Sequence, residues 1–216
     1  MFYLGLVLIT AGLCMIGYVG WEIYGTNIVS HQKQDQLVTG LHRAWASGAP
    51  SPGNGGAKAA ESGPAGDAEA LIRIPRFGAS YEMPVLRGVG DDALASGFGH
   101  FEDSADPGGR GNYALAAHRV THGQPLRNMP ALRPGDKIIV ETRDAVYTYR
   151  LDTNPNDLVV TFRDVWVIAP RPHNPDPGGV EPVQDPRLIT LTTCAELFHT
   201  DNRMIAFGHL TGVVRR

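Results

Sequence analysis

Cys194 is the only cysteine of this 216-residue chain outside its long N-terminal apolar segment, which contains Cys14 as an expected packing residue. Cys194 ends the run RLITLTTC, whose alternation of side chains predicts a strand, and the polar stretch AELFHTDN follows it. Strand ends and the loops after them often carry functional groups. With no second cysteine to pair with in the same domain, this thiol is either an inert buried side chain or a reactive one.

A reactive thiol needs a base or a cation beside it, and His118 is the candidate base among eight histidines. It ends the apolar run NYALAAH, a second strand-end position, and the turn-like RVTHGQP follows. The alternative is a structural histidine held by a hydrogen bond. His118 and His122 have the spacing of a helical metal pair, but a strand-to-loop segment has no shared helix face, so no metal site is expected.

Arg203 is the candidate cation. It opens the run RMIAFGHL only nine residues after Cys194, so a short connection would pair the two runs antiparallel and bring guanidinium and thiol together. At that place a guanidinium can hold a substrate carbonyl or a developing oxyanion. The alternative is an ordinary ion pair with Asp201 or Glu196.

The elements that must position these side chains are short strands. Residues 71–216 have the size of one ordinary domain, and their hydrophobic pattern has period two, as in AVYTYRL, KIIVET and DVWVIAP. Turn signals rich in proline, glycine and asparagine separate the runs. About eight such strands without long helical segments predict an all-β barrel or sandwich with one or two short helical turns.

Residues 1–25 predict a membrane anchor, because about 20 apolar residues cross a bilayer as a helix. The stretch carries a single carboxylate, Glu22, and aromatic rings near both ends, whereas a cleaved signal peptide would have a basic start and a small-residue cleavage site. The nearest basic residues, Lys33 and Arg43, follow the segment and weakly favour a cytoplasmic position for the rest of the chain.

Residues 26–70 are expected to form a stalk and a flexible linker, since 20 of the 25 residues from 46 to 70 are Ala, Gly, Pro or Ser. Such a composition buries too little apolar surface to offset the entropy of ordering it. The net charge of −3 argues against nucleic acid as a partner. Two cysteines exclude both a disulfide-rich scaffold and a four-cysteine zinc site.

These motifs together resemble the sortase family, and within it the class E sortases of high-GC Gram-positive bacteria. The stretch TLTTC, residues 190–194, is similar to the sortase signature TLxTC, and NYALAAHR, residues 112–119, to the segment that contains the catalytic histidine. Arg203 matches the arginine on the strand after the cysteine. The likeness extends over nearly all of residues 71–216, and the order of anchor, linker and domain also fits.

The resemblance implies a sortase-like eight-stranded β-barrel, preceded by a transmembrane helix, that acts as a cysteine transpeptidase of the hydrolase class. Cys194 would attack the Thr–Gly bond of an LAXTG- or LPXTG-type sorting signal, and His118 would exchange protons with the thiol and the leaving amine. Arg203 would bind the substrate and stabilise the oxyanion. The residues expected to contribute to substrate binding are Thr193, Tyr113 and Ala117.

The resemblance also implies the partners and the location. Secreted proteins with a sorting signal would supply the acyl group, and a peptidoglycan-precursor amine of the lipid II type would receive it, which anchors surface proteins to the wall. No cofactor, metal or nucleic acid is expected. The single-pass anchor, residues 1–25, would hold the catalytic barrel, residues 71–216, outside the cell, against the weak charge signal.

Two other functions stay open. A pilin-polymerising sortase tends to have an Asp-Pro-aromatic element before the barrel and a second membrane helix, where this chain has a Gly/Ala-rich stretch and the end TGVVRR. A non-catalytic, membrane-tethered barrel that binds wall or peptide ligands would have an unreactive Cys194. An L,D-transpeptidase would show a Ser-His-Gly-Cys motif, which TTC is not.

Overall fold

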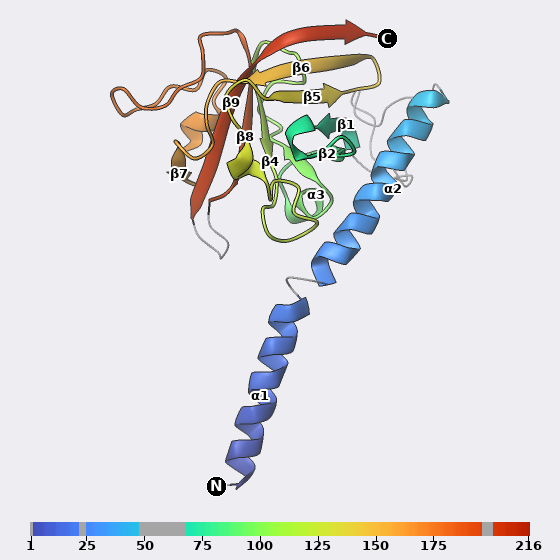
Figure 1. Cartoon of the computed structure of the whole chain (residues 1–216), viewed down its shortest axis with the longest axis vertical. Helices are drawn as coiled ribbons and strands as arrows, with labels where there is room; N and C mark the ends of the chain where they lie inside the picture. The colour runs from blue at the N-terminus through green and yellow to red at the C-terminus, as the bar shows by residue number, and fades with distance from the viewer. Residues whose placement is uncertain (1, 22–24, 48–67, 196–200) are drawn as a thin grey trace.

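The alternating runs fold into short strands in a computed structural model that describes residues 2–21, 25–47, 68–195 and 201–216 (Figure 1). Within these residues the strands are β1 (Ala68–Arg73), β2 (Met83–Arg87), β3 (Phe98–His100), β4 (Gly111–Ala116), β5 (Lys137–Glu141), β6 (Ala145–Leu151), β7 (Val159–Thr161), β8 (Arg187–Cys194) and β9 (Asn202–Arg215). The helical elements there are α1 (Phe2–Gly20), α2 (Thr26–Ala46), α3 (Asp91–Leu94) and the 3₁₀ turns η2 (Pro75–Phe77), η3 (Met129–Ala131) and η4 (Val165–Ile168).

Eight of the strands close into a barrel. Their order is β6-β5-β1-β2-β3-β4-β8-β9, and an antiparallel pairing of β9 with β6 closes the circle. The pairs β2–β3 and β4–β8 are parallel. The short strand β7 pairs with the beginning of β9, and β6 pairs with the same edge of β9 nearer its C-terminal end. β7 therefore adds to the barrel without interrupting its closure. The predicted eight-stranded barrel is confirmed.

The inward-facing residues of these strands form the main core. Phe98, Tyr113 and Tyr149 are among the largest fully buried side chains, and they pack with branched aliphatic residues contributed by all sides of the barrel. A second cluster around Phe207 lies between the barrel wall and η4. Burial of these apolar surfaces provides the main favourable term in folding and makes the barrel a rigid support for its rim.

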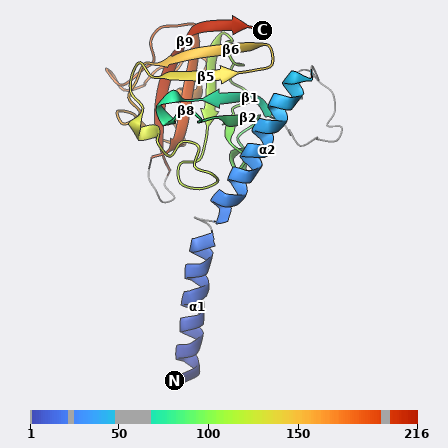
Figure 2. The same ribbon diagram turned by 45° about the vertical axis from the view of Figure 1, so that its right-hand side comes forward.

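α2 is a helix that the sequence did not predict. Its residues were assigned to the stalk, without a secondary structure. Its buried residues Ser30, Gln34, Leu37 and Leu41 form one stripe with helical spacing. The two leucines pack on Ala68, Leu71 and Leu86, which are residues of β1 and β2. Figure 1 and Figure 2 both show α2 lying along the outside of the barrel next to these strands. Only two of its four buried residues are apolar, so the hydrophobic period is weak.

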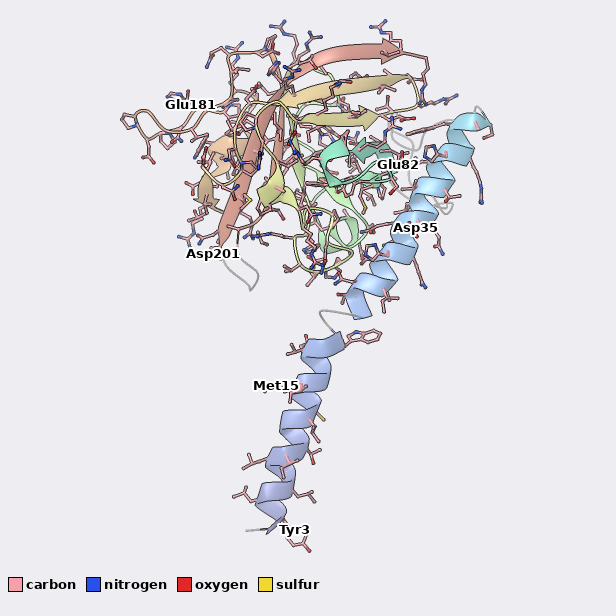
Figure 3. All side chains as sticks on the ribbon, viewed as in Figure 1. Tyr3, Met15, Asp35, Glu82, Glu181 and Asp201 are labelled. Atoms are coloured by element: carbon pink, nitrogen blue, oxygen red, sulfur yellow. The ribbon has the colours of Figure 1, made fainter. Side chains whose placement is uncertain are left out.

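α1 extends away from the barrel, and its side chains, such as that of Met15, project from a helix that has no other described segment beside it (Figure 3). The window Tyr3–Gly20 has a mean hydropathy of 1.9 and is not buried by the rest of the described chain. By length and composition this helix can cross a membrane. The predicted flexible linker centres on residues 48–67, which lie outside the described residues.

Candidate functional site

Cys194 and Arg203 face each other across the two longest strands of the barrel. In the register of β8 with β9, these two residues are direct antiparallel partners. Residues opposite each other in such a pair hold their Cβ atoms about 5 Å apart, so side chains on the same face can interact. The pairing is the one that the short connection between the two runs predicted. Cys194 is a free thiol and is half-buried.

His118 lies level with Cys194 because β4 runs parallel to β8. The last paired residues are Ala116 and Thr192, and two residues beyond them come His118 and Cys194. The backbone N–H of Ala117 donates to the carbonyl of Thr192 at 3.1 Å, which continues the ladder past the end of β4. The Thr193 hydroxyl donates to the carbonyl of Ala117 at 2.7 Å. These bonds hold the two strand ends side by side.

The three candidate side chains line one pocket at this end of the barrel, with a volume of about 330 Å³. Ala117 and Thr193, two of the three expected substrate-binding residues, also line it. Most of the remaining wall is apolar: Leu94, Phe101, Val160, Phe162, Val165, Val167, Ile168 and Ile205. Asp201, just before β9, marks this end of the barrel, which is the end nearer to α1 (Figure 3).

Tyr113, the third expected substrate-binding residue, is not among the residues that line the pocket. Its side chain is only 1% exposed and belongs to the main core, where its ring packs edge-on against His100 at 4.7 Å between centroids. The reason is its place in mid-strand, because β4 reaches the pocket only where the strand ends, at Ala116 and beyond.

His118 is held as a neutral imidazole. Burial and then the neighbouring His122 lower the pKa of His118 to about 4; Asp91 opposes this shift, and the Arg203 guanidinium adds the smallest lowering effect. The His122 ring stacks on the His118 ring with centroids 4.5 Å apart. The Thr121 hydroxyl lies 3.4 Å from His118 Nδ1. At neutral pH this imidazole therefore has a free electron pair with which it can accept a proton.

Two buried polar residues hold the wall of the pocket in place, and neither was predicted from the sequence to have this role. Asn112 Nδ2 donates to the carbonyls of Val167 and Ala169, both at 3.1 Å. The Thr190 hydroxyl donates to Asn112 Oδ1 at 2.8 Å. Because Asn112 is in β4 and Thr190 in β8, the strands that lead to His118 and Cys194 also hold η4. The signal in the sequence was a polar residue inside each of two apolar strands.

Arg119 is a further residue of the site to which the sequence analysis assigned no role. Its guanidinium donates to the carbonyl of Ala195, and its Nη1 lies 3.4 Å from the carbonyl oxygen of Cys194. The residue that follows His118 thus contacts the backbone that follows the thiol. Across the described ranges, no group of three or more His, Cys, Asp or Glu side chains is arranged as a metal site.

A thiol, a neutral imidazole and a permanent cation at the mouth of an apolar pocket are the groups that acyl transfer through a thioester requires. A closed β-barrel with this grouping at its rim defines the class of the β-barrel cysteine transpeptidases.

The chain matches the model of one protein family over most of its length. The model of the sortase domain matches residues 72–211, and the chain belongs to the sortase family. The family consists of cysteine transpeptidases that act on sorting-signal proteins and cell-wall precursors, and its members are membrane-associated.

Individual relatives agree with class E. Sortase SrtE1 of Streptomyces coelicolor is 34% identical over 215 residues, which are 96% of this chain and 56% of that protein. The chain thus spans little more than half the length of this relative. Sortase SrtE2 of the same organism is 28% identical over 221 residues, covering 96% of this chain and 80% of that protein.

Solved structures of class E sortases share the fold. Sortase E of Streptomyces avermitilis has a TM-score of 0.60 and 36% identity, and the match covers 69% of this chain and 91% of that chain. Sortase E1 of Streptomyces coelicolor, with a tripeptide in its active site, has a TM-score of 0.58 and 30% identity with the same coverage.

Proposed function

We propose that this protein is a membrane-anchored transpeptidase that cleaves an LAXTG- or LPXTG-type sorting signal between Thr and Gly. It transfers the acyl group to an amine of a peptidoglycan precursor and so anchors surface proteins to the wall. The observation that carries the proposal is that Cys194, His118 and Arg203 line one pocket. Membership of the sortase family supports the same reaction.

In this mechanism Cys194 Sγ attacks the carbonyl carbon of the Thr–Gly bond while His118 accepts the thiol proton. The C–N bond then breaks, His118 gives its proton to the leaving Gly amine, and a thioester remains on Cys194. An incoming amine attacks the thioester, His118 accepts a proton from that amine, and the proton returns to the sulfur as it leaves. Such proton transfers typically contribute about 10²–10⁴-fold to the rate.

Arg203 stabilises the negative oxygen of the two tetrahedral intermediates. It is the direct cross-strand partner of Cys194, and its charge is present at every working pH. Its planar group can donate two parallel hydrogen bonds, which suits both an oxyanion and a substrate carbonyl. Donors aimed at the developing charge are worth about 10²–10³ in rate.

The apolar wall would accept the side chains of the sorting signal that precede the Thr. Phe162 and Val165 are 53% and 66% exposed although they line the pocket, so an apolar substrate residue would remove their surfaces from water. Ala117 and Thr193 lie beside the candidate catalytic residues, where the Thr of the signal would bind. Tyr113 has no place in this proposal.

The proposed organisation has three parts: residues 1–25 as the anchor, 26–70 as stalk and linker, and 71–216 as the catalytic barrel outside the cell. α2 lies within the stalk and docks on the barrel. The loop after His118 reaches α2 at Asn27, close to the end of α1, through a bond from the Gly123 N–H at 2.8 Å. A site at that end of the barrel can approach a precursor amine held at the membrane.

The test uses the full chain in detergent micelles with paired LAXTG and LPXTG peptides and candidate amines, and mass spectrometry identifies the products. We expect cleavage between Thr and Gly, a transfer product, and a thioester on Cys194. The variant Cys194→Ala should give none of these. Turnover of Cys194→Ala near that of the wild type would disprove the mechanism. A Cys194 that no substrate-like electrophile labels would instead favour the non-catalytic binding barrel.

A further inference from the structure

The loop after His118 contains an unusual backbone turn. His122 and Gln124 have φ values of 53°, and Gly123 between them has a φ of 78°. Among the described residues, His122 and Gln124 are the only ones other than glycine with positive φ. Non-glycine residues in this left-handed region are strained and persist where surrounding contacts determine the conformation.

The contacts that determine this turn include two from α2. Gln34 Nε2 donates to the carbonyl of His122 at 3.1 Å, and the N–H of Gly123 donates to Asn27 Oδ1 at 2.8 Å. Gln34 is only 2% exposed. A Cβ atom on Gly123 would lie 2.5 Å from Gln34 Oε1, so the helix and the turn fit closely at this point.

The same turn brings the His122 ring against His118. The two rings are stacked, with centroids 4.5 Å apart and planes 25° apart. At the far end of the loop, the N–H of Leu126 donates to the carbonyl of His118 at 3.0 Å, which closes the loop on its first residue. A change in the turn at His122 would therefore uncover one face of the His118 ring.

We propose that Asn27 and Gln34 are positioning residues for His118: by holding the left-handed turn at His122 and Gly123, they keep the His122 ring stacked on the His118 imidazole. The catalytic consequence rests on the proposed function, whereas the effect on the His118 ring does not. Neither residue touches the reacting atoms. The helix that follows the anchor thereby becomes part of the support of the candidate active site.

The charged and titratable groups around His118 come from several elements. They are His122 on the same loop, Arg203 on β9, Cys194 on β8, Asp91 on α3, and Asp164, which lines the same pocket just before η4. Burial is the largest cause of the lowered pKa of His118, and His122 is the second. Release of the turn would expose the ring and remove this neighbour, so both effects would move the pKa of His118 up towards its ordinary value of 6.5.

The first measurement is a histidine NMR titration of the full chain in detergent micelles, with His118→Gln used to assign the His118 signal. Asn27→Ala and Gln34→Ala each remove one bond to the turn. We expect the pKa of His118 to rise by about one unit in both variants. Gln32→Ala, at an exposed position of the same helix, is the matched control and should leave the titration unchanged.

The second measurement is the peptide reaction itself. With Asn27→Ala or Gln34→Ala, we expect kcat to fall about fivefold, as for the loss of one net hydrogen bond, with little change in KM. Asn27→Asp keeps an oxygen that can accept the Gly123 N–H and should retain the wild-type kcat. Asn27→Leu fills a similar volume but has no acceptor, so a role in packing alone would preserve kcat in this variant, whereas loss of the bond from the Gly123 N–H predicts the same fall as in Asn27→Ala.

His122→Asn keeps the proposal testable if the α2 variants do not fold, since Asn tolerates positive φ but has no imidazole to stack. We expect the pKa of His118 to rise in this variant too. An unchanged His118 titration in Asn27→Ala, Gln34→Ala and His122→Asn would overturn the proposal, and so would equal losses in Asn27→Ala and Asn27→Asp. If the titrations shift as expected but the wild type cleaves no peptide, the proposed function fails while the positioning role stands.

Discussion

The role proposed for Arg203 at the mouth of the pocket can be tested by one substitution. Arg203→Lys keeps the positive charge but loses the planar pair of donors that faces a carbonyl or an oxyanion. We expect kcat/KM for peptide cleavage to fall about 100-fold, the effect of one lost oxyanion donor. The matched control is Arg187→Lys at the exposed opposite end of β8, which should have no effect. Equal activity of the two variants would rule out the proposed role of Arg203.

His118 gives the stability of the protein a predictable pH dependence. Because its pKa is lowered to about 4 from an ordinary 6.5, the unfolded chain binds this proton more readily than the folded one between those pH values. The contribution is fully present above pH 6.5 and is lost as the pH falls towards 4. Urea unfolding at pH 7 and pH 5 should therefore show a smaller loss of stability in His118→Gln than in the wild type. The same loss in both proteins would contradict the lowered pKa.

The residue types predicted the candidate site better than they predicted its surroundings. Each of Cys194, His118 and Arg203 also had a structural interpretation, and they could be chosen because their order and their positions at strand ends match the sortase motifs. Tyr113 could not be excluded in the same way. Whether a tyrosine in a strand faces the core or a pocket depends on where the strand ends, and the sequence predicts strand ends least well.

At the scale of secondary structure, the site depends on the parallel pairing of β4 with β8. Two parallel strands end at the same edge, so residues two positions beyond Ala116 and Thr192 become neighbours although they are far apart in the chain. Antiparallel β9 then adds Arg203 opposite Cys194. Period-two patterns predict the strands themselves, but the partner of each strand depends on contacts distant in sequence. The parallel pairing of β4 with β8 could therefore not be predicted from the sequence and was seen only in the structure.

α2 illustrates the opposite case, an element that the sequence did not predict. Its buried stripe contains Ser30 and Gln34 in addition to Leu37 and Leu41, so its hydrophobic period is too weak to distinguish it from a stalk. The polar half of this stripe includes Gln34, which bonds to the loop after His118. The buried Gln34 weakens the hydrophobic period that would have predicted the helix, and the same side chain bonds to another element.

The hydrogen bond from Thr190 to Asn112 contributes to the way β4 and β8 hold η4, and a substitution at Thr190 tests this contribution. Thr190→Val keeps the shape of the side chain but removes the donor to the buried Asn112 Oδ1. An unsatisfied buried acceptor costs about 1–3 kcal/mol, which we expect as the loss of unfolding free energy in urea. The half-buried Thr148→Val, in β6, is the matched control and should change stability less. Equal changes would show that the bond does not stabilise the pocket wall.

On the scale of the whole molecule, two parts meet at one end of the barrel, and a third precedes them in the chain. The barrel rim presents the pocket, the N-terminal half of α2 contacts the loop after His118, and α1 precedes α2 in the chain. Figure 1 shows this end of the barrel directed towards α1. Under the proposed function, with α1 across the membrane, this end of the barrel would be turned towards the bilayer surface.

Insertion of α1 into a membrane can be tested by placing charged side chains in its apolar window. Ile9→Arg combined with Leu13→Arg places two cations near the centre of the apolar window Tyr3–Gly20, where each costs about 3 kcal/mol on insertion. We expect the wild type to remain in the membrane pellet after an alkaline wash and the double variant to move to the soluble fraction. Val183→Arg combined with Val214→Arg, at exposed barrel positions, adds the same charge and should leave the protein in the pellet. A wild type that washes off, or a double variant that stays, would contradict insertion of α1. Since none of the four substituted residues lines the pocket, peptide cleavage in detergent should be equal in all three proteins, so that loss of anchoring is separated from loss of the fold.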